Sequence, residues 1–267
     1  MPITIQDLAA WKAEGKRFVM LTAYDYPTAR LLAEADVPVL LVGDTLADNV
    51  LGYANTIPVT MTEMLHHARA VARGAPNQLL VGDLPFGTYQ RSCGDAIDNA
   101  VEYLKAGMHA VKLEGGGWAV ETVARLTQRG IPVMGHVGLT PQSVNAFGGM
   151  KVQGRSAGDR ERIIADAHAL EAAGAFAIVL EGVPRGLAAQ VTSELTIPTI
   201  GIGAGPDCDA QVLVIYDMLG ITGHLRGTAP KFVKAYADLG EQIVSAARAY
   251  ASDVREGRFP DDAHSFH

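Results

Sequence analysis

The sequence is short of cysteine and contains no cluster of positive charge. Its two cysteines, Cys93 and Cys208, lie far apart and match no spacing typical of a metal or redox centre, so we expect reduced thiols in a cytoplasmic protein. The formal net charge is -7, and Lys and Arg form no run. Because nucleic acids and anionic membranes are bound through clustered positive charge, neither is an expected partner.

Long apolar stretches are also missing. No apolar run approaches the length of a membrane span, and the first residues lack the basic and apolar segments of a secretory signal. The 267 residues are nevertheless 48% hydrophobic and 19% charged, which is typical of a folded domain with a sizeable core. We therefore expect a protein that has no membrane partner and folds without disulfides.

What the sequence does have is a recurring alternation of short apolar segments and helical segments, with no linker between them. After a short helix at 7–14, strands are expected at 18–23, 37–42, 79–81, 110–114, 132–135, 176–180, 199–202 and 211–218. Helices are expected at 27–35, 60–73, 95–106, 118–129, 159–173, 187–195 and 231–250, and loops at 46–58 and 138–156.

This alternation predicts a parallel sheet, and eight repeats predict that the sheet closes. The expected fold is therefore α/β, a (β/α)8 TIM barrel with a short N-terminal helix, in a single domain over residues 1–267. An open doubly wound sheet is the alternative, but it gives no reason for eight repeats. The weakest part of the prediction is the last pair of strands, since little room for a helix lies between them.

Several of the expected strands end in an ionisable side chain. Active sites of such barrels lie at the carboxyl ends of the strands, where we place Asp44, Asp83, Glu114, His136 and Glu181. Carboxylates that converge on one mouth repel one another, so a divalent cation is expected there. Oxygen ligands without cysteine favour Mg²⁺. The alternative, that each acid caps a helix or pairs with an arginine, explains a single acid better than it explains the set.

The fourth expected strand ends in Lys112-Leu113-Glu114 and is followed by three glycines. Since successive side chains of a strand point to opposite faces, Lys112 and Glu114 share one face. The glycines end the strand and leave a bare backbone that a ligand can approach. Lys112 can form a Schiff base, bind a substrate carboxylate or pair with Glu114. Nearby acids raise a lysine pKa, which favours binding over Schiff-base chemistry.

Two further strand-end residues have more than one interpretation. Glu181 stands in an apolar segment, a setting that suits a general base, and a helix cap is the equally good alternative. His136 can ligate a metal, donate a hydrogen bond to a substrate, or be a satisfied polar residue at a strand end. The sequence pattern alone favours the last of these for His136.

Two other patterns are set aside. Glu63, His66 and His67 lack the spacing of a zinc protease, and adjacent histidines face different sides of a helix, so solvent exposure explains them. The glycine-rich segment 201–205 lacks the dinucleotide-binding spacing. It is interpreted as a tight barrel corner or a site for a phosphate-like anion.

Beyond these patterns, the chain resembles the ketopantoate hydroxymethyltransferase family over nearly its whole length. The motifs that carry the resemblance, in the same order as in the family, are TAYDY (22–26), VGD (42–44), DLPF (83–86), KLEGG (112–116), GHVGLTPQS (135–143), FGG (147–149), VQGR (152–155), GIGAG (201–205), PKF (230–232) and HSF (264–266). The segment from HVGLTPQS to VQGR is highly specific. Thr45 departs from the family, which often has Ser there, but keeps the hydroxyl, and segments 46–50 and 222–228 also differ from the usual family sequence.

The resemblance implies a Mg²⁺-dependent enzyme of pantothenate and coenzyme A synthesis. Its reaction moves a one-carbon unit from the co-substrate 5,10-methylenetetrahydrofolate to 3-methyl-2-oxobutanoate, through an enolate held by the metal, and gives 2-dehydropantoate. It also implies a homo-oligomer, commonly a decamer. The site residues implied by position are Asp44, Asp83 and Glu114 for the metal, Asp44, Thr45, Asp83, Lys112 and His136 for the keto acid, and Glu181 as the catalytic proton acceptor.

Three other functions are alternatives to this one. A Mg²⁺-dependent lyase or mutase of the phosphoenolpyruvate mutase and isocitrate lyase type also uses a barrel, but the Lys-Lys-Cys-Gly-His loop typical of that group is absent. A non-catalytic barrel would bind the keto acid as a sensor and never exchange its protons. A metal-free Schiff-base aldolase would use Lys112 and would be indifferent to chelators.

Overall fold

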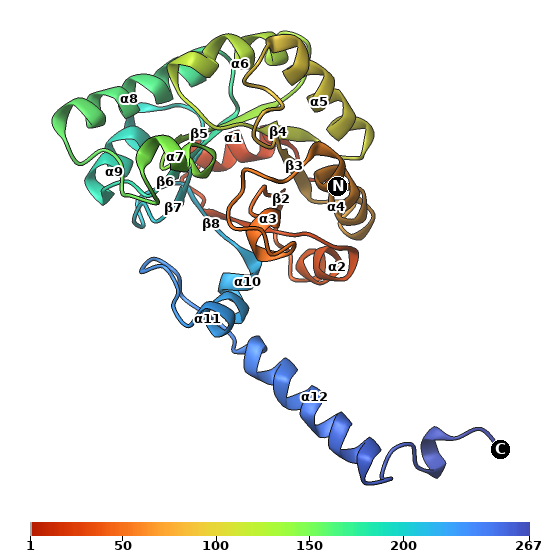
Figure 1. The fold of residues 1–267 in the computed structure, drawn as a ribbon. Coiled ribbons are helices and arrows are strands. Elements are labelled where there is room, and N and C mark those ends of the chain that lie inside the picture. The colour runs from red at the N-terminus through yellow and green to blue at the C-terminus, as the bar shows by residue number, and fades with distance from the viewer. Residues whose placement is uncertain (1) are drawn as a thin grey trace. The chain divides into compact units, whose positions relative to one another are not determined.

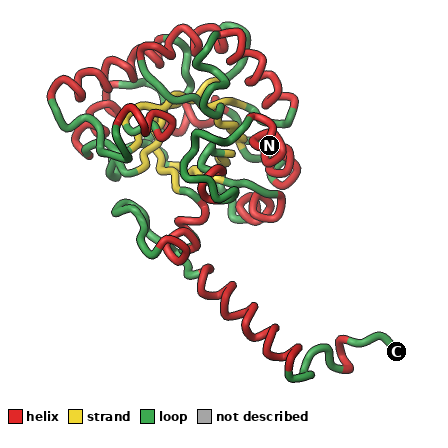
Figure 2. The backbone as a smooth tube through the Cα atoms, in the orientation of Figure 1, coloured by secondary structure: helices red, strands yellow, loops and turns green. Residues whose placement is uncertain are grey.

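The computed structural model describes residues 2–267 and contains a closed barrel of eight parallel strands (Figures 1 and 2). Each strand pairs with its neighbours in chain order, and β8 pairs with β1. The (β/α)8 TIM barrel expected from the sequence is confirmed. The strands are β1 (Phe18–Thr22), β2 (Val39–Val42), β3 (Leu79–Asp83), β4 (Ala110–Lys112), β5 (Val133–Gly138), β6 (Ala177–Glu181), β7 (Thr199–Ile202) and β8 (Ala210–Leu213).

Helices surround the strands on the outside of the barrel, red around yellow in Figure 2. Four of them begin after a residue whose side chain accepts a backbone N–H group. Thr60 and Glu63 form the expected capping box, and Asp25, Ser92 and Ser156 cap three other helices. The helices between strands are α2 (Tyr26–Glu34), α4 (Met61–Gly74), α5 (Cys93–Lys105), η1 (Gly117–Ala119), α6 (Val120–Thr127), α8 (Ala157–Ala172) and α9 (Arg185–Glu194).

The short N-terminal helix α1 (Ile5–Ala13) closes the amino end of the barrel. Its Leu8 is fully buried and packs among residues at the starts of the strands, including Val39 and Leu79. Lys12 of the same helix donates to the carboxylate of Asp209, just before β8, at 2.8 Å. Because α1 seals this end, the opposite end of the barrel is the one that stays open for a ligand.

Two segments expected as loops contain short helices. Segment 46–58 begins with α3 (Leu46–Asn49), and segment 138–156 contains η2 (Pro141–Ser143) and α7 (Val144–Phe147). The loop prediction was wrong at these places. Helices of three or four residues are too short to show a helical period in the sequence, which explains the error.

The end of the chain differs most from the expectation. Residues 215–218, expected at the end of the eighth strand, form α10 (Ile215–Met218), because a short apolar run does not by itself separate a strand from a helix. The closing helix, expected at 231–250, begins and ends later in the chain. It is α12 (Leu239–Arg255), which follows α11 (Ile221–Arg226) and precedes η3 (Asp262–His264).

The connection between β7 and β8 is short, as the sequence suggested, and the described residues form no helix in it. Gly203 and Gly205 have φ angles of 60° and 85°, which glycine adopts readily. A side chain on Gly205 would collide with Arg185. These features agree with the interpretation of segment 201–205 as a tight barrel corner, and the alternative, a site for a phosphate-like anion, stays a prediction.

The chain divides into two compact units, one ending at Val214 and the other formed by Ile215–His267. The barrel belongs to the first unit, and α10, α11, α12 and η3 belong to the second. This division does not test the expectation of a single domain, which stays a prediction. No helix within residues 2–267 combines the length and the apolar character that crossing a membrane requires.

Candidate active site

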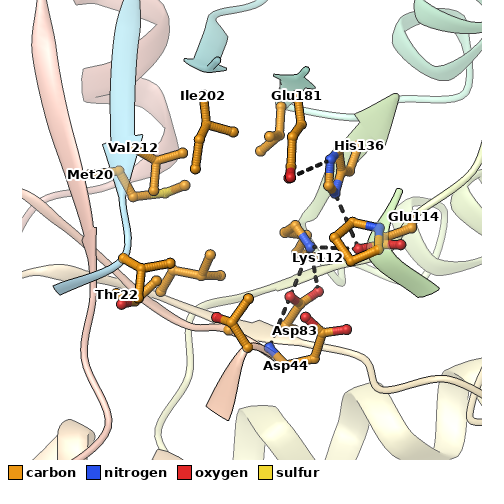
Figure 3. A pocket seen from close by; sticks show the side chains of 16 residues that line it. Met20, Thr22, Asp44, Asp83, Lys112, Glu114, His136, Glu181, Ile202 and Val212 are labelled. Atoms are coloured by element: carbon orange, nitrogen blue, oxygen red, sulfur yellow. Dashed lines mark hydrogen bonds and ion pairs between the residues drawn. The ribbon is translucent and has the colours of Figure 1, made fainter. Parts of the chain in front are cut away.

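The carboxyl ends of the strands form a pocket (Figure 3). Asp83 and Glu181 end β3 and β6, His136 lies within β5, and Asp44 and Glu114 each follow a strand by two residues. The structure brings all the predicted site residues together here, and the roles assigned to them stay predictions. The predicted residues that line the pocket are Asp44, Thr45, Asp83, Lys112, Glu114, His136 and Glu181.

Lys112 lies among three buried carboxylates. Its Nζ donates to both oxygens of Asp83, at 2.7 and 2.8 Å, and lies 3.8 Å from Glu114 Oε1. The backbone N–H of Asp44 donates to Asp83 Oδ2 at 3.2 Å, which brings the third acid alongside. None of these four residues is more than 4% exposed. A single ammonium group therefore faces three carboxylates that are shielded from water.

Burial and mutual repulsion shift the pKa values of this cluster. Burial, and then the charges of Asp83 and Glu114, raise the pKa of Asp44 well above its ordinary value. Burial lowers the pKa of Lys112, but the charges of the surrounding acids outweigh it and raise that pKa. Lys112 is therefore an ammonium, which binds anions, and not the free amine that begins a Schiff base.

His136 lies between the buried acids and Glu181. Its Nδ1 is 3.4 Å from Glu114 Oε1, and its Nε2 is 3.3 Å from Glu181 Oε2. Each ring nitrogen thus faces one carboxylate, and whether His136 also contacts a substrate stays a prediction. Burial and the charge of Lys112 lower the pKa of His136, but the two carboxylates outweigh them and raise it to about 9. The imidazole is consequently protonated at neutral pH.

Glu181 is the most accessible acid of the pocket. Its side chain is 18% exposed, compared with 2% for Asp83 and Glu114. The next helix, α9, begins after Pro184 with no side-chain cap, so the alternative of Glu181 as a helix cap is wrong. The carboxylate is therefore available to a ligand in the cavity.

An apolar wall faces this ionic cluster. Met20, Ile202 and Val212 lie across the cavity from Lys112 and Asp83 (Figure 3). The full set of apolar side chains that line the pocket is Met20, Leu41, Val179, Ile202, Val212 and Val214, with Pro141 at the rim. The cavity can therefore hold a small molecule with a charged end and a branched alkyl end.

The hydroxyl of Thr45 is fixed by a buried neighbour. Thr45 Oγ1 lies 2.8 Å from the hydroxyl of Tyr24, which stands in the loop after β1.

The two adjacent histidines of α4 differ in their surroundings. The Nδ1 atom of His67 lies 2.5 Å from the backbone carbonyl oxygen of Tyr24. His66 is exposed as expected, but His67 is half-buried. Solvent exposure was thus the wrong explanation for His67.

Two residues that the sequence analysis did not assign hold the acids in place. Gln142 donates from Nε2 to Asp44 Oδ2 at 2.9 Å and from its backbone N–H to Glu114 Oε2 at 3.0 Å. Tyr89 contacts the Glu114 backbone at 3.1 Å and Gln142 Oε1 at 2.7 Å through its hydroxyl. Gln142 stands shortly after β5 in a motif that carries the resemblance, which is the one sequence feature that could have identified it. Tyr89 has no comparable feature.

The glycines after Glu114 accommodate a neighbouring helix. Asp166 of α8 accepts a hydrogen bond from the N–H of Gly117 at 2.8 Å. A Cβ on Gly116 would overlap the carboxylate of Asp166. The expectation that a ligand approaches this bare backbone is wrong for Gly116 and Gly117, because Asp166 occupies the space.

The cluster of acids has the chemistry that a divalent cation needs. Glu114 Oε1 is buried, with His136 Nδ1 at 3.4 Å and Lys112 Nζ at 3.8 Å. Beside it, burial and the charges of Asp83 and Glu114 raise the pKa of Asp44, which a cation at this acid would oppose. Residues 2–267 contain no group of three or more His, Cys, Asp and Glu side chains already placed to hold a metal. Mg²⁺ is commonly bound by one or two carboxylates together with water and substrate oxygens. Asp44 and Asp83, with Glu114 beside them, fit that pattern.

Comparison with known proteins finds the same kind of sequence in a characterised family. The sequence model described as ketopantoate hydroxymethyltransferase matches residues 2–262. A protein of Carboxydothermus hydrogenoformans named 3-methyl-2-oxobutanoate hydroxymethyltransferase is 54% identical over 265 residues, 99% of this chain and 95% of that protein. One of Rhodococcus jostii with the same name is 55% identical over 261 residues, 97% of this chain and 89% of that protein.

Solved structures of other proteins share the fold. A phosphonopyruvate hydrolase solved with oxalate and Mg²⁺ has a TM-score of 0.62 at 17% identity, covering 98% of this chain and 91% of that one. A 2,3-dimethylmalate lyase, of the PEP mutase/isocitrate lyase superfamily, has a TM-score of 0.61 at 17% identity, covering 100% and 93%. At such identities the likeness concerns the barrel alone.

Proposed function

Because the chain belongs to the ketopantoate hydroxymethyltransferase family, we propose that it transfers a hydroxymethyl group to 3-methyl-2-oxobutanoate. In this proposal 5,10-methylenetetrahydrofolate is the co-substrate that supplies the carbon, and water supplies the hydroxyl oxygen. The products are 2-dehydropantoate and tetrahydrofolate. The first of these would then serve pantothenate and coenzyme A synthesis.

The proposal rests on one observation: Glu181 differs from the other acids of the pocket in its exposure and its contacts. Asp44, Asp83 and Glu114 each accept a hydrogen bond from an N–H donor, and they are nearly inaccessible. Glu181 contacts His136 Nε2 at 3.3 Å and, with a side chain 18% exposed, is the most exposed of the four. This arrangement supports two roles, with three acids for binding and one for proton transfer.

The keto acid has a carboxylate and a keto oxygen at one end, and the ionic side of the pocket suits that end. The Lys112 ammonium and the Thr45 hydroxyl supply donors, and both line the cavity. Asp44 and Asp83, with Glu114 beside them, would hold Mg²⁺. When bound, Mg²⁺ supplies positive charge that polarises the keto group and makes the neighbouring proton more acidic.

The branched carbon of the keto acid would then face Glu181. In this proposal the Glu181 carboxylate removes the proton of that carbon, and the protonated His136, 3.3 Å from Glu181 Oε2, orients the carboxylate. The enolate carbon then forms a bond to the methylene carbon of the folate, and a water oxygen becomes the hydroxyl group on that carbon. Both methylene–nitrogen bonds break, and the two nitrogens take up one proton from the keto acid and one from water, which releases tetrahydrofolate. The apolar wall contacts the two methyl groups and keeps water away from the enolate.

Product formation tests the proposal. The protein is incubated with 3-methyl-2-oxobutanoate, 5,10-methylenetetrahydrofolate and Mg²⁺, and 2-dehydropantoate is measured by mass spectrometry. We expect product with Mg²⁺, its loss with EDTA, and its return when excess Mg²⁺ is added. Keto-acid binding without product under any condition would favour a sensor. Product that is insensitive to EDTA, with borohydride trapping on Lys112, would favour a Schiff-base aldolase.

A further inference from the structure

Gln142 is buried beside the pocket without lining it. It lies in η2, directly after β5, and is 4% exposed. The preceding residue, Pro141, lines the cavity, whereas Gln142 does not line it and contacts the carboxylate of Asp44. A group in this place can reach a ligand only through the residues that it holds.

The side-chain amide of Gln142 uses all four of its hydrogen-bonding positions. Its Nε2 donates to Asp44 Oδ2 and to the carbonyl oxygen of Leu84, both at 2.9 Å. Its Oε1 accepts from the Tyr89 hydroxyl at 2.7 Å and from Gln90 Nε2 at 3.1 Å. An amide has two donors and two acceptor positions, so this side chain is saturated.

These partners also fix which way the amide points. A rotation that exchanged oxygen and nitrogen would place Oε1 against the Asp44 carboxylate and the Leu84 carbonyl, and would leave Tyr89 and Gln90 without an acceptor. Four contacts would be lost at once in a site that water does not reach. Tyr89 is itself held by stacking on Trp118, with ring centroids 5.9 Å apart.

The same residue holds a second acid through its backbone. The N–H of Gln142 donates to Glu114 Oε2 at 3.0 Å, which leaves Glu114 Oε1 directed toward Lys112 and His136. One residue thus holds two carboxylates that follow two different strands, β2 and β4.

We propose that Gln142 is a positioning residue that sets the spacing and orientation of Asp44 and Glu114 for the divalent cation, and that Tyr89 fixes the amide in its donating orientation. The inference rests on the proposed function, since it needs the cation. Residues that orient the ligands of a metal change its affinity by about 10- to 100-fold when replaced.

The direct test is Mg²⁺ affinity, measured by calorimetric titration in the presence of 3-methyl-2-oxobutanoate. In Gln142→Met, which keeps the length and loses the amide, we expect affinity to fall by about 10- to 100-fold. Tyr89→Phe, which removes only the hydroxyl, should give a smaller loss. The control is Gln78→Met, since Gln78 is also buried but lies at the amino end of the barrel, and Mg²⁺ affinity should be unchanged.

A kinetic readout separates positioning from general damage to the fold. If Gln142 acts through the cation, raising the Mg²⁺ concentration should restore most of the lost rate in Gln142→Met, whereas a misfolded pocket would not recover. Should Gln142→Met fail to fold, Tyr89→Phe alone decides the matter. Wild-type affinity in Tyr89→Phe and Gln142→Met, with an active wild-type protein, overturns the inference and leaves the proposed function standing. Absence of Mg²⁺ binding in the wild type overturns both.

Discussion

At the scale of single residues, chemically similar side chains of the pocket differ in burial and in neighbouring charge, according to their position in the fold. Asp44 and Glu181 are both carboxylates at strand ends, but burial and two neighbouring acids raise the pKa of Asp44, and Glu181 is partly exposed beside a charged imidazole. Lys112 remains an ammonium because three acids surround it. The chemistry proposed for the pocket depends on these differences.

Replacement of Glu181 tests the role of the exposed acid. In Glu181→Gln we expect 3-methyl-2-oxobutanoate to bind with nearly unchanged affinity, because Lys112 and Thr45 remain. Exchange of the branched-carbon proton should fall by about 10²-fold or more, since a positioned general base contributes roughly that much. Binding is measured by calorimetry and exchange by NMR in deuterated water. Retention of the wild-type exchange rate would reject Glu181 as the base.

The site residues could be predicted from the sequence to the extent that they stand at strand ends. The alternation of strands and helices fixes which residues reach the carboxyl edge, so Asp44, Asp83 and Glu181 could be placed together. Gln142 and Tyr89 could not be assigned, because their contacts depend on how the long connections fold back over the barrel. A sequence pattern carries no periodicity for such connections.

At the scale of secondary-structure elements, the amino end of the barrel is packed shut and the carboxyl end carries the pocket. The amino end is sealed by α1, whose Leu8 is fully buried among strand residues. The carboxyl end carries the pocket and the short helices α3, η2 and α7. Stability and chemistry are therefore separated along the barrel axis, which is usual for this fold.

The separation predicts the effect of a cavity at the amino end. Leu8→Ala should reduce the free energy of unfolding by about 2–5 kcal/mol, the usual range for a buried leucine. The rate per folded molecule should change little, because the pocket lies at the other end. The control is Leu31→Ala on α2, where the leucine is 65% exposed and the cost should be small. Both are measured by urea denaturation, and equal costs in the two variants would contradict this account of α1.

A second element-scale contact ties α8 to the segment between α9 and β7. Glu171 Oε1 accepts from the Thr196 N–H and hydroxyl, both at 2.7 Å, and from the Ile197 N–H at 3.1 Å. Burial raises the pKa of Glu171, but these hydrogen bonds outweigh it and hold the pKa below its ordinary value of 4.5. A carboxyl whose pKa is lower in the folded state adds stability above its unfolded pKa and loses it as the pH falls through the folded pKa.

Glu171→Gln should therefore be less stable than the wild type at pH 7, and the difference should shrink as the pH falls below 4.5. The difference in stability between the variant and the wild type is measured by thermal unfolding, followed by circular dichroism, across this pH range. Glu161→Gln, at an exposed position on the same helix, is the control and should show no such trend. A difference that stays constant with pH would show that the Glu171 contact does not depend on charge.

Element boundaries were predictable where local chemistry marks them. The capping residue Thr60 precedes α4 as expected, because its side chain accepts the N–H of Glu63, which has no backbone partner in the first turn of the helix. The end of the eighth strand was not predictable, since the apolar run continues from β8 into α10 without a break. The strand is distinguished from the helix by its backbone pairing with β1 and β7.

At the scale of the whole molecule, the unit Ile215–His267 is described by itself, and its helix α12 carries an exposed apolar stripe. Ile243, Tyr250 and Val254 are 54%, 61% and 45% exposed, and with Ala247 they follow a spacing of four, three and four residues. Throughout α12, which the structure describes completely, only Gly240 is buried. This spacing is typical of a helix that packs against another surface. The homo-oligomer implied by the family resemblance, commonly a decamer, stays a prediction, with a second copy of the chain as the expected partner.

A charge within the stripe should therefore weaken self-association. In Ile243→Glu we expect the mass in solution, measured by size-exclusion chromatography with light scattering, to fall toward that of one chain, because burying an unpaired carboxylate is costly. The matched control is Ala249→Glu, at an exposed position on the other side of α12, and its mass should equal that of the wild type. An unchanged mass in Ile243→Glu would show that the stripe is not an interface.

The central claim is that this barrel removes a proton from the branched carbon of a keto acid with the help of a divalent cation. The most direct measurement is NMR-detected exchange of that proton in 3-methyl-2-oxobutanoate, in deuterated water, with Mg²⁺ and then with EDTA, with and without tetrahydrofolate. The account predicts exchange that needs Mg²⁺ and stops with EDTA. The absence of exchange under every condition, with the keto acid demonstrably bound, would contradict it.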